Sequence, residues 1–228
     1  IAAGLMLAST LALRALLEED ATGAGATGTG SYRQLISSLL PLARRHPEVI
    51  ASGVIQGLSF GIFLLVWMGI GLHLTSPEVG LGVDDVGYLG LFSIVNVVTT
   101  PPLGRWADRV GPRRARVVVA VVQMAGLALL FFTGTSFWLL AVPIVIISVA
   151  GPLVDVTGRM TALGAAPEIR TRLMSLYIVL MFLGGGVGSW VGTIAYDLGG
   201  WMLNVSLACF CSTLIVLLSM AALRSERC

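Results

Sequence analysis

The chain has 228 residues, of which 56% are hydrophobic and only 11% are charged, and its formal net charge at pH 7 is +2. With a mean hydropathy of +0.92 it is too apolar for an ordinary soluble domain, so a soluble catalytic domain is excluded. Nucleic-acid binding is not indicated either, because the basic residues fall in short segments between apolar runs. The composition predicts an all-α transmembrane protein.

The first 48 residues contain no complete predicted crossing. Residues 1–13 are apolar but shorter than the about 20 residues that a helix needs to cross a bilayer. They do not resemble a signal peptide, because no basic stretch precedes the apolar run. We expect them to be the end of a preceding transmembrane helix. Residues 14–48 are expected to form a linker, with a flexible part rich in glycine, threonine and acid and a short interfacial helix near Leu35–Leu40.

Six apolar runs follow, and the spans predicted from them are 49–73, 86–103, 117–133, 137–156, 173–196 and 201–223. The loops after the second and fourth runs are rich in arginine, whereas the other three are acidic or uncharged. All 14 basic residues are arginines, and a six-span arrangement puts every one on the same side of the membrane. The positive-inside rule makes that side cytoplasmic. We therefore expect a six-helix domain over 49–223, a cytoplasmic tail over 224–228 and both chain ends in the cytoplasm.

The loop between the second and third runs is a charged island, Gly104–Arg116, with five arginines. An arginine at the bilayer centre costs about 2.5–3.5 kcal/mol, so all five are expected in water or among headgroups. Gly104 and Gly111 are expected to turn the backbone. Asp108 is the only acid in the island that can order the guanidinium groups, and the spacing is G-x3-D-R-x-G-x-R-R-x-R.

This spacing, set between two apolar runs, resembles the loop signature of the major facilitator superfamily of secondary transporters. A second stretch, Ala166–Leu173 followed by Gly184–Ser189 and Trp201, is similar to the tenth-to-eleventh-helix region of drug-efflux-like bacterial members. The resemblance implies a six-helix bundle that corresponds to the second half of that fold. Pro112 departs from it, because a basic residue is frequent at this position. Family members bind substrate between two halves, so the resemblance also implies a missing N-terminal six-helix half as a partner.

The resemblance further implies a proton-coupled efflux carrier, an antiporter of the cell membrane that exports small lipophilic molecules. The sequence has no phosphate-binding G-x4-G-K-[ST] pattern, which argues against ATP hydrolysis by this chain and leaves a proton gradient as the expected energy source. No cofactor or metal is expected, because the three cysteines lack metal-ligand spacing.

Two alternatives remain open. The first is a non-transporting membrane protein or a truncated half that only packs with a partner. The second, an intramembrane enzyme, is disfavoured because His46 and His73, the two histidines, are predicted at opposite membrane faces. A serine nucleophile would need a nearby base.

Asp155 is the only acid within a predicted span, near the arginine-rich end of the fourth. An ionisable group at membrane depth is a candidate proton carrier or cation partner. The alternative is a structural role, in which Asp155 pairs with Arg159 four residues further along the same helix face.

Four amides lie within apolar runs, and each is costly to bury without a hydrogen bond. In the family the first, second, fourth and fifth helices of this half line the transport pathway. The resemblance therefore implies that Gln56 and Asn96 face the substrate, whereas Gln123 and Asn204 pack between helices. Trp67 is expected either to stack on an aromatic or cationic substrate or to belong to the interfacial aromatic belt.

Gly184, Gly188 and Gly192 recur every four residues and predict a smooth stripe that allows close helix contact. The charged island has two interpretations. In one it only fixes topology, with Asp108 partly neutralising Arg109 or Arg113. In the other, which the resemblance adds, it is a gating latch: Asp108 and the arginines, Arg114 among them, contact a helix end of the opposite half.

Overall fold

The computed structural model describes residues 41–133, 137–164 and 166–224, and within these ranges the chain is helical with short connections and no β-strand. The predicted helix end at 1–13, the linker up to residue 40 and the last four residues of the tail lie outside the described residues.

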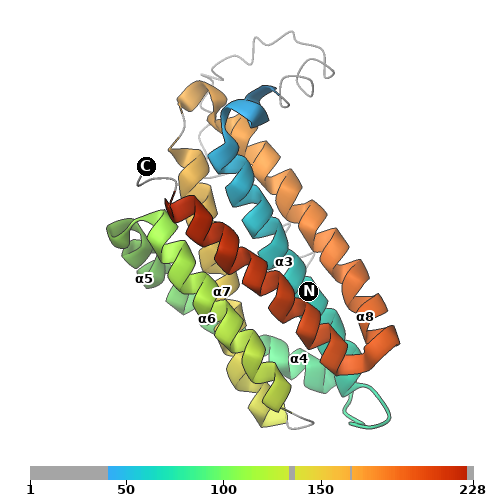
Figure 1. The fold of residues 1–228 in the computed structure, drawn as a ribbon. Helices are drawn as coiled ribbons and strands as arrows, with labels where there is room; N and C mark the ends of the chain where they lie inside the picture. Colours follow the sequence, from blue (N-terminus) through green and yellow to red (C-terminus); the bar gives the residue numbers. More distant parts are fainter. Residues whose placement is uncertain (1–40, 134–136, 165, 225–228) are drawn as a thin grey trace, which may run out of the picture. The chain divides into compact units, whose positions relative to one another are not determined.

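The helices follow one another as α3 (Pro47–Leu74), α4 (Val83–Phe92), α5 (Val95–Val110), α6 (Pro112–Leu129), α7 (Phe137–Leu163) and α8 (Pro167–Arg224), as Figure 1 shows. A 3-10 turn, η1 (Leu130–Phe132), extends α6. Among the described residues, five apolar helical stretches are long enough to cross a bilayer, with α4 and α5 counted as one stretch.

The last stretch, Ile169–Arg224, has 56 residues, which at 1.5 Å per residue would span about 84 Å if it were straight. It is not straight, because Gly199 (φ −148°, ψ 18°) and Gly200 (φ 61°, ψ −157°) leave the helical conformation and the chain reverses there. Gly200 has the positive φ that residues with a side chain rarely adopt. The stretch is thus two helices, and the predicted all-α six-helix bundle is confirmed.

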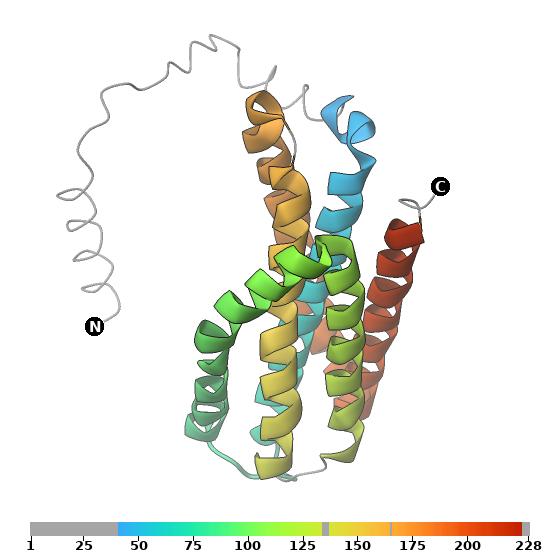
Figure 2. The ribbon, with the colours of Figure 1, turned by 90° about the vertical axis from the view of Figure 1, so that its left-hand side faces the viewer.

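The second predicted span differs in detail from the structure, because it is interrupted at Ser93 and Ile94. The N–H groups of Ser93 and Ile94 donate to the carbonyls of Gly90 and Leu91, both at 3.0 Å. These i to i−3 bonds tighten the backbone into a single 3-10-like turn. Figure 2 shows α4 and α5 as a bent rod at the edge of the bundle that leads into α6.

The charged island is helical on both sides of a one-residue turn. Gly111, with φ 95° and ψ 136°, separates α5 from α6. The prediction that Gly104 also turns the chain is wrong, because Gly104 lies inside α5. The helix continues past it because Leu103, Trp106 and the fully buried Ala107 pack against the core.

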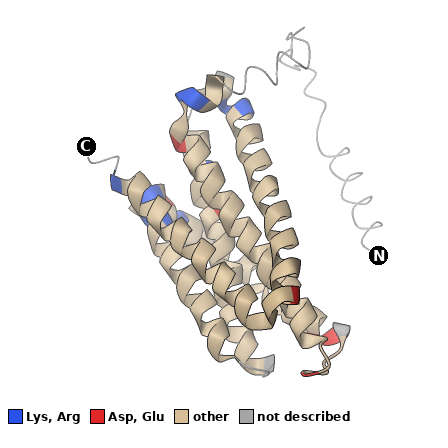
Figure 3. Cartoon of the chain, turned by 45° about the vertical axis from the view of Figure 1, so that its right-hand side comes forward, with Lys and Arg blue, Asp and Glu red and all other residues tan. Residues whose placement is uncertain are grey.

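The arginines gather toward one end of the bundle, whereas acidic residues lie at both ends (Figure 3). The arginines of the described residues lie toward one end, called here the arginine-rich end, whereas Glu78, Asp84, Asp85 and Asp197 lie at the opposite end. These arginines are Arg44, Arg45, Arg105, Arg109, Arg113, Arg114, Arg116, Arg159, Arg170, Arg172 and Arg224. The predicted one-sided distribution is therefore present in the described part of the chain.

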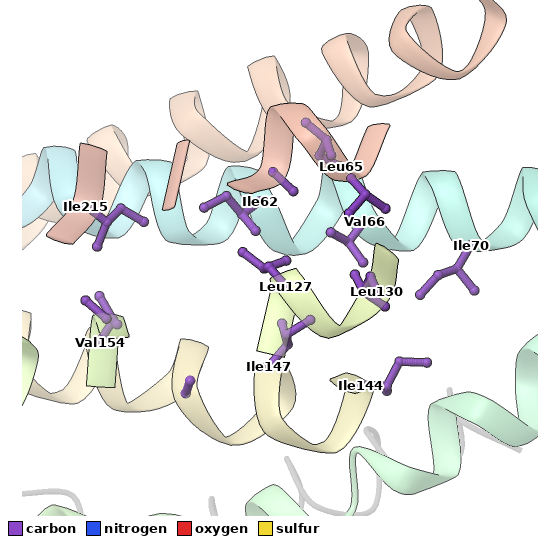
Figure 4. Packing of buried hydrophobic residues seen from close by; sticks show 14 of the residues in the cluster. Ile62, Leu65, Val66, Ile70, Leu127, Leu130, Ile144, Ile147, Val154 and Ile215 are labelled. Carbon is purple, nitrogen blue, oxygen red and sulfur yellow. The ribbon is translucent and has the colours of Figure 1, made fainter. Parts of the chain in front are cut away.

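The largest group of buried side chains at the centre of the bundle is an apolar cluster. Ile62, Val66 and Ile70 of α3 meet Leu127 of α6 and Ile147 of α7, and all of these side chains are at most 5% exposed (Figure 4). Burial of this kind against neighbouring helices positions α3 as the central helix.

The closest helix contact joins α3 to the first part of α8. A Cβ atom on Gly57 would lie 2.7 Å from the carbonyl oxygen of Leu180, and one on Gly61 would lie 2.7 Å from that of Gly184. A Cβ on Gly188 would clash with the backbone of Gly61, and one on Gly192 would lie 2.8 Å from the Cα of Leu65. The predicted glycine stripe thus faces a complementary glycine stripe on α3.

We predict that Gly188→Ala lowers the free energy of unfolding by about 1–3 kcal/mol, because the added methyl group forces the two backbones apart. Gly186→Ala is the matched control, since a Cβ there meets nothing within 4 Å. The control should be neutral or stabilising by up to about 1 kcal/mol, because alanine is the better helix former. Unfolding of both variants in detergent, followed by circular dichroism, checks this; equal stability would contradict the packing argument.

Candidate functional site

A polar cluster at the arginine-rich end surrounds Asp155 of α7. Arg159 donates through Nε to Asp155 Oδ2 at 2.8 Å, and the Tyr177 hydroxyl of α8 donates to Asp155 Oδ1 at 3.0 Å. The expected pairing with Arg159 is present, and the Asp155 side chain is 22% exposed. The Tyr177 ring is fully buried, and Gly158 makes room for it because a Cβ there would lie 2.9 Å from Tyr177 Cζ. No sequence pattern marks Tyr177, which is a single tyrosine within an apolar run.

Arg116 is the buried arginine of the bundle, with only 2% of its surface exposed. It donates to Ser52 Oγ of α3 at 2.9 Å. From α7 it binds Thr157, through both the hydroxyl (3.3 Å) and the carbonyl (2.8 Å), and the Thr161 hydroxyl at 3.2 Å. These four neutral acceptors offset part of the desolvation cost of a charged group. The prediction that all five island arginines lie in water or headgroups is therefore wrong for Arg116, which the register of α6 turns inward beside the buried Ala115.

The rest of the island is accessible. Asp108, Arg109 and Arg114 are exposed, whereas Arg113 is half-buried and donates through Nη1 to the Ala222 carbonyl at 3.2 Å. The Asp108 carboxylate forms no ion pair or hydrogen bond with Arg109, Arg113 or any other residue in the described ranges. Its carboxylate is therefore available to a group outside them.

Two of the four amides hold helices together. Gln123 of α6 and Ser59 of α3 form a buried pair, with Gln123 Nε2 donating to the serine hydroxyl at 3.2 Å. Asn204 donates from Nδ2 to the carbonyls of Gly192 (3.0 Å) and Leu65 (3.3 Å) and is fully buried. Both lie between helices, as the family resemblance implied.

The other two amides differ from each other. Gln56 is only 5% exposed, and its Oε1 has no hydrogen-bond partner among the described residues. Asn96 of α5 is half-buried, and its Oδ1 accepts a hydrogen bond from the Thr100 hydroxyl one turn further on. Trp67, also half-buried, packs edge-on against Phe63 with ring centroids 6.0 Å apart.

Helix α5 carries a polar segment that sequence reasoning missed apart from Asn96. Pro101 and Pro102 lie inside the helix and have no N–H, so the carbonyls of Val97 and Val98 lack their helical donors. Both valines are 73% exposed. The most apolar window of the α4–α5 stretch is only 6% buried, against 61% in α3. The sequence Thr-Thr-Pro-Pro inside a predicted span is the signal that marks this segment.

The histidines do not form a catalytic pair. His46 caps the start of α3 and His73 lies in its last turn, at opposite ends of the bundle. The residues that the structure describes also contain no group of three histidine, cysteine or acidic side chains arranged to hold a metal ion.

Comparison with known proteins gives consistent matches. Residues 49–227 match the family model described as Major Facilitator Superfamily. The chain is 22% identical over 171 residues to "Uncharacterized transporter YgaY" of Escherichia coli O157:H7, which covers 75% of this chain and 43% of that protein. It is 29% identical over 166 residues to "Probable transporter SCO4007" of Streptomyces coelicolor, covering 70% and 37% respectively. The chain thus spans less than half the length of the curated relatives it matches.

We predict that Thr157→Val destabilises the bundle by about 1–3 kcal/mol, because the change keeps the side-chain shape but leaves a buried Arg116 N–H without an acceptor. Thr171→Val is the control, since Thr171 is exposed at the same end. Thermal unfolding of the purified variants measures the difference. If both variants have the same melting temperature, the burial of Arg116 does not depend on the Thr157 hydroxyl.

Proposed function

Because the chain belongs to the Major Facilitator Superfamily, a family of multi-pass membrane transporters, we propose that it forms the C-terminal half of a proton-coupled secondary transporter. The matched relatives are more than twice as long as the aligned part, which leaves room for a second six-helix half. On this proposal the arginine-rich end is cytoplasmic and the protein lies in the cell membrane.

The sparsely buried α4–α5 stretch supports a second half. A transmembrane helix with unpaired backbone carbonyls is tolerated where these groups are buried in protein or line a water-filled cavity. The backbone carbonyls of Val97 and Val98 have no helical donor, and both residues are 73% exposed. We place the substrate pathway along this face, with Asn96 as the principal contact and Gln56 and Trp67 of α3 as further candidates.

The observation that carries proton coupling is the geometry of Asp155. Its carboxylate lies within a span and is held by two donors, Tyr177 from α8 and the 39% exposed Arg159 from its own helix. Protonation removes the charge that holds Arg159 and leaves Tyr177 facing a neutral acid. A change in the charge of this carboxyl group would therefore alter the link between α7 and α8.

The unpaired Asp108 supports the latch. An exposed carboxylate in the last turn of α5, at the arginine-rich end, is positioned to contact a helix end of the other half when that end of the transporter closes. The exposed Arg109 and Arg114 add donors for the same contact. The latch would hold one conformational state and release it during turnover.

Small lipophilic molecules are the proposed substrates, exported in exchange for protons. The walls offered by this half are apolar, with few polar side chains to fix a hydrophilic ligand. The competing proposal, a half that only packs with a partner and transports nothing, predicts no flux in any reconstituted form.

We predict that Asp155→Asn, made in the full-length protein, abolishes substrate flux driven by a pH gradient, because asparagine cannot exchange a proton. Flux into proteoliposomes with and without an imposed gradient measures this. Asp197→Asn, at the opposite end of the bundle and exposed, is the control and should behave as the unmodified protein. An Asp155→Asn protein with unchanged pH dependence would assign Asp155 a structural role only.

We further predict that Asp108→Asn slows turnover while the amount of protein in the membrane stays constant, because the closed state loses a charge-assisted contact. A loss of about 1.4 kcal/mol in that contact corresponds to a tenfold change in the equilibrium between states. Glu78→Gln, an acid in the loop at the opposite end, is the control. Full activity of Asp108→Asn argues against the latch.

A further inference from the structure

A cavity of about 1010 Å³ opens at the arginine-rich end between α3, α6 and the last turns of α8. Three arginines line it, Arg44 before α3 and Arg113 and Arg116 at the start of α6. Among the described residues that line it, Glu48 is the only acid. The Glu48 carboxylate accepts a hydrogen bond from His46 at 3.0 Å. The cavity is therefore cationic.

The buried guanidinium group of Arg116 is a desolvated cation in the wall of this cavity. All of its hydrogen bonds go to neutral oxygens, and it has no ion pair with any acid in the described ranges. A guanidinium group has five N–H donors, and four bonds leave one without an acceptor. A buried charge of this kind is stabilised by an anion, and the one remaining N–H can donate to a single phosphate oxygen.

An apolar groove of about 340 Å³ adjoins this cavity at Val54, which lines both. The groove follows the glycine contact between α3 and α8, and its walls include Leu58, Ile62 and Leu183. From Val54 to Leu65 it extends along α3 for about 16 Å at 1.5 Å per residue. This length is about half of the roughly 30 Å hydrocarbon core, that is, one leaflet.

We propose that the cavity and the groove together bind one anionic phospholipid from the leaflet at the arginine-rich end. The phosphate lies among Arg44, Arg113 and Arg116, and one acyl chain lies in the groove beyond Val54. The charge of the cavity selects an anionic headgroup, and the adjoining leaflet-length groove selects a lipid over a soluble phosphate. The test reads lipid retention and thermal stability, so its outcome does not depend on a flux measurement.

The test uses the full-length protein purified in detergent and measures retained lipid by native mass spectrometry and the melting temperature on lipid addition. Phosphatidylglycerol is expected to be retained and to raise the melting temperature more than phosphatidylcholine does. The double variant Arg44→Gln, Arg113→Gln should weaken phosphatidylglycerol binding about tenfold or more, because charge-assisted hydrogen bonds to the phosphate are lost. Arg172→Gln removes the same charge at the same end but outside the cavity, and should bind normally.

Two further arms identify the ligand. Glycerol phosphate carries the anionic group without acyl chains and is expected to have little effect; stabilisation equal to that by phosphatidylglycerol would overturn the lipid assignment. Val54→Phe narrows the junction of cavity and groove and should weaken phosphatidylglycerol binding.

The proposal is wrong if phosphatidylcholine and phosphatidylglycerol bind equally, or if the arginine variants retain lipid as the control does. Because Arg44 is exposed and lies outside the Arg116 hydrogen-bond network, Arg44→Gln alone keeps the test valid if the double variant does not fold.

Discussion

The exclusion of charge from the hydrocarbon core is the constraint on which this structure depends. Arginine is costly at the bilayer centre, so the arginine clusters lie outside the hydrocarbon core, and each pair of crossings returns the chain to the same end for the next cluster. The consequence is visible in the arginines, which gather toward one end of the bundle (Figure 3). Once the direction of each helix is set in this way, the apolar faces of α3, α6 and α7 are buried against one another. They form the core around Ile62 and Leu127.

Arg116 is the informative exception to that constraint. Its guanidinium group is almost fully buried, yet it ties α6 to Ser52 of α3 and to Thr157 of α7. Asp155 then links α7 to α8 through Tyr177. Four helices are thus connected by polar contacts near one end. The centre of the bundle is held by apolar side chains, with a few buried amides such as Gln123 and Asn204.

The sequence predicts the number of helices from span length and the common end of the arginines from the cost of burying charge. It also predicts the Asp155–Arg159 pair from the i to i+4 spacing, and all three are local properties. The burial of Arg116 and the role of Tyr177 were not predictable, because both depend on which residues of other helices lie opposite. The predicted turn at Gly104 was wrong for a related reason. A glycine permits a turn but does not require one, and Trp106 and Ala107 continue the buried face of α5 beyond it. The complementary stripe of Gly57 and Gly61 likewise becomes meaningful only once α8 is placed against it.

These two kinds of contact suit a transporter that changes shape. Along the glycine contact, Gly61 and Gly188 bring two backbones together, and Phe60 packs edge-on against Phe182 beside them, so this contact is mainly non-directional. At the arginine-rich end the hydrogen bonds are directional, and a displacement there breaks several at once. On the proposed function, protonation of Asp155 weakens the directional contacts and leaves the non-directional ones intact. The helices can then move relative to one another at the arginine-rich end while α3 and α8 stay packed. For this reason we place the proton-dependent switch at Asp155 and not in the apolar centre.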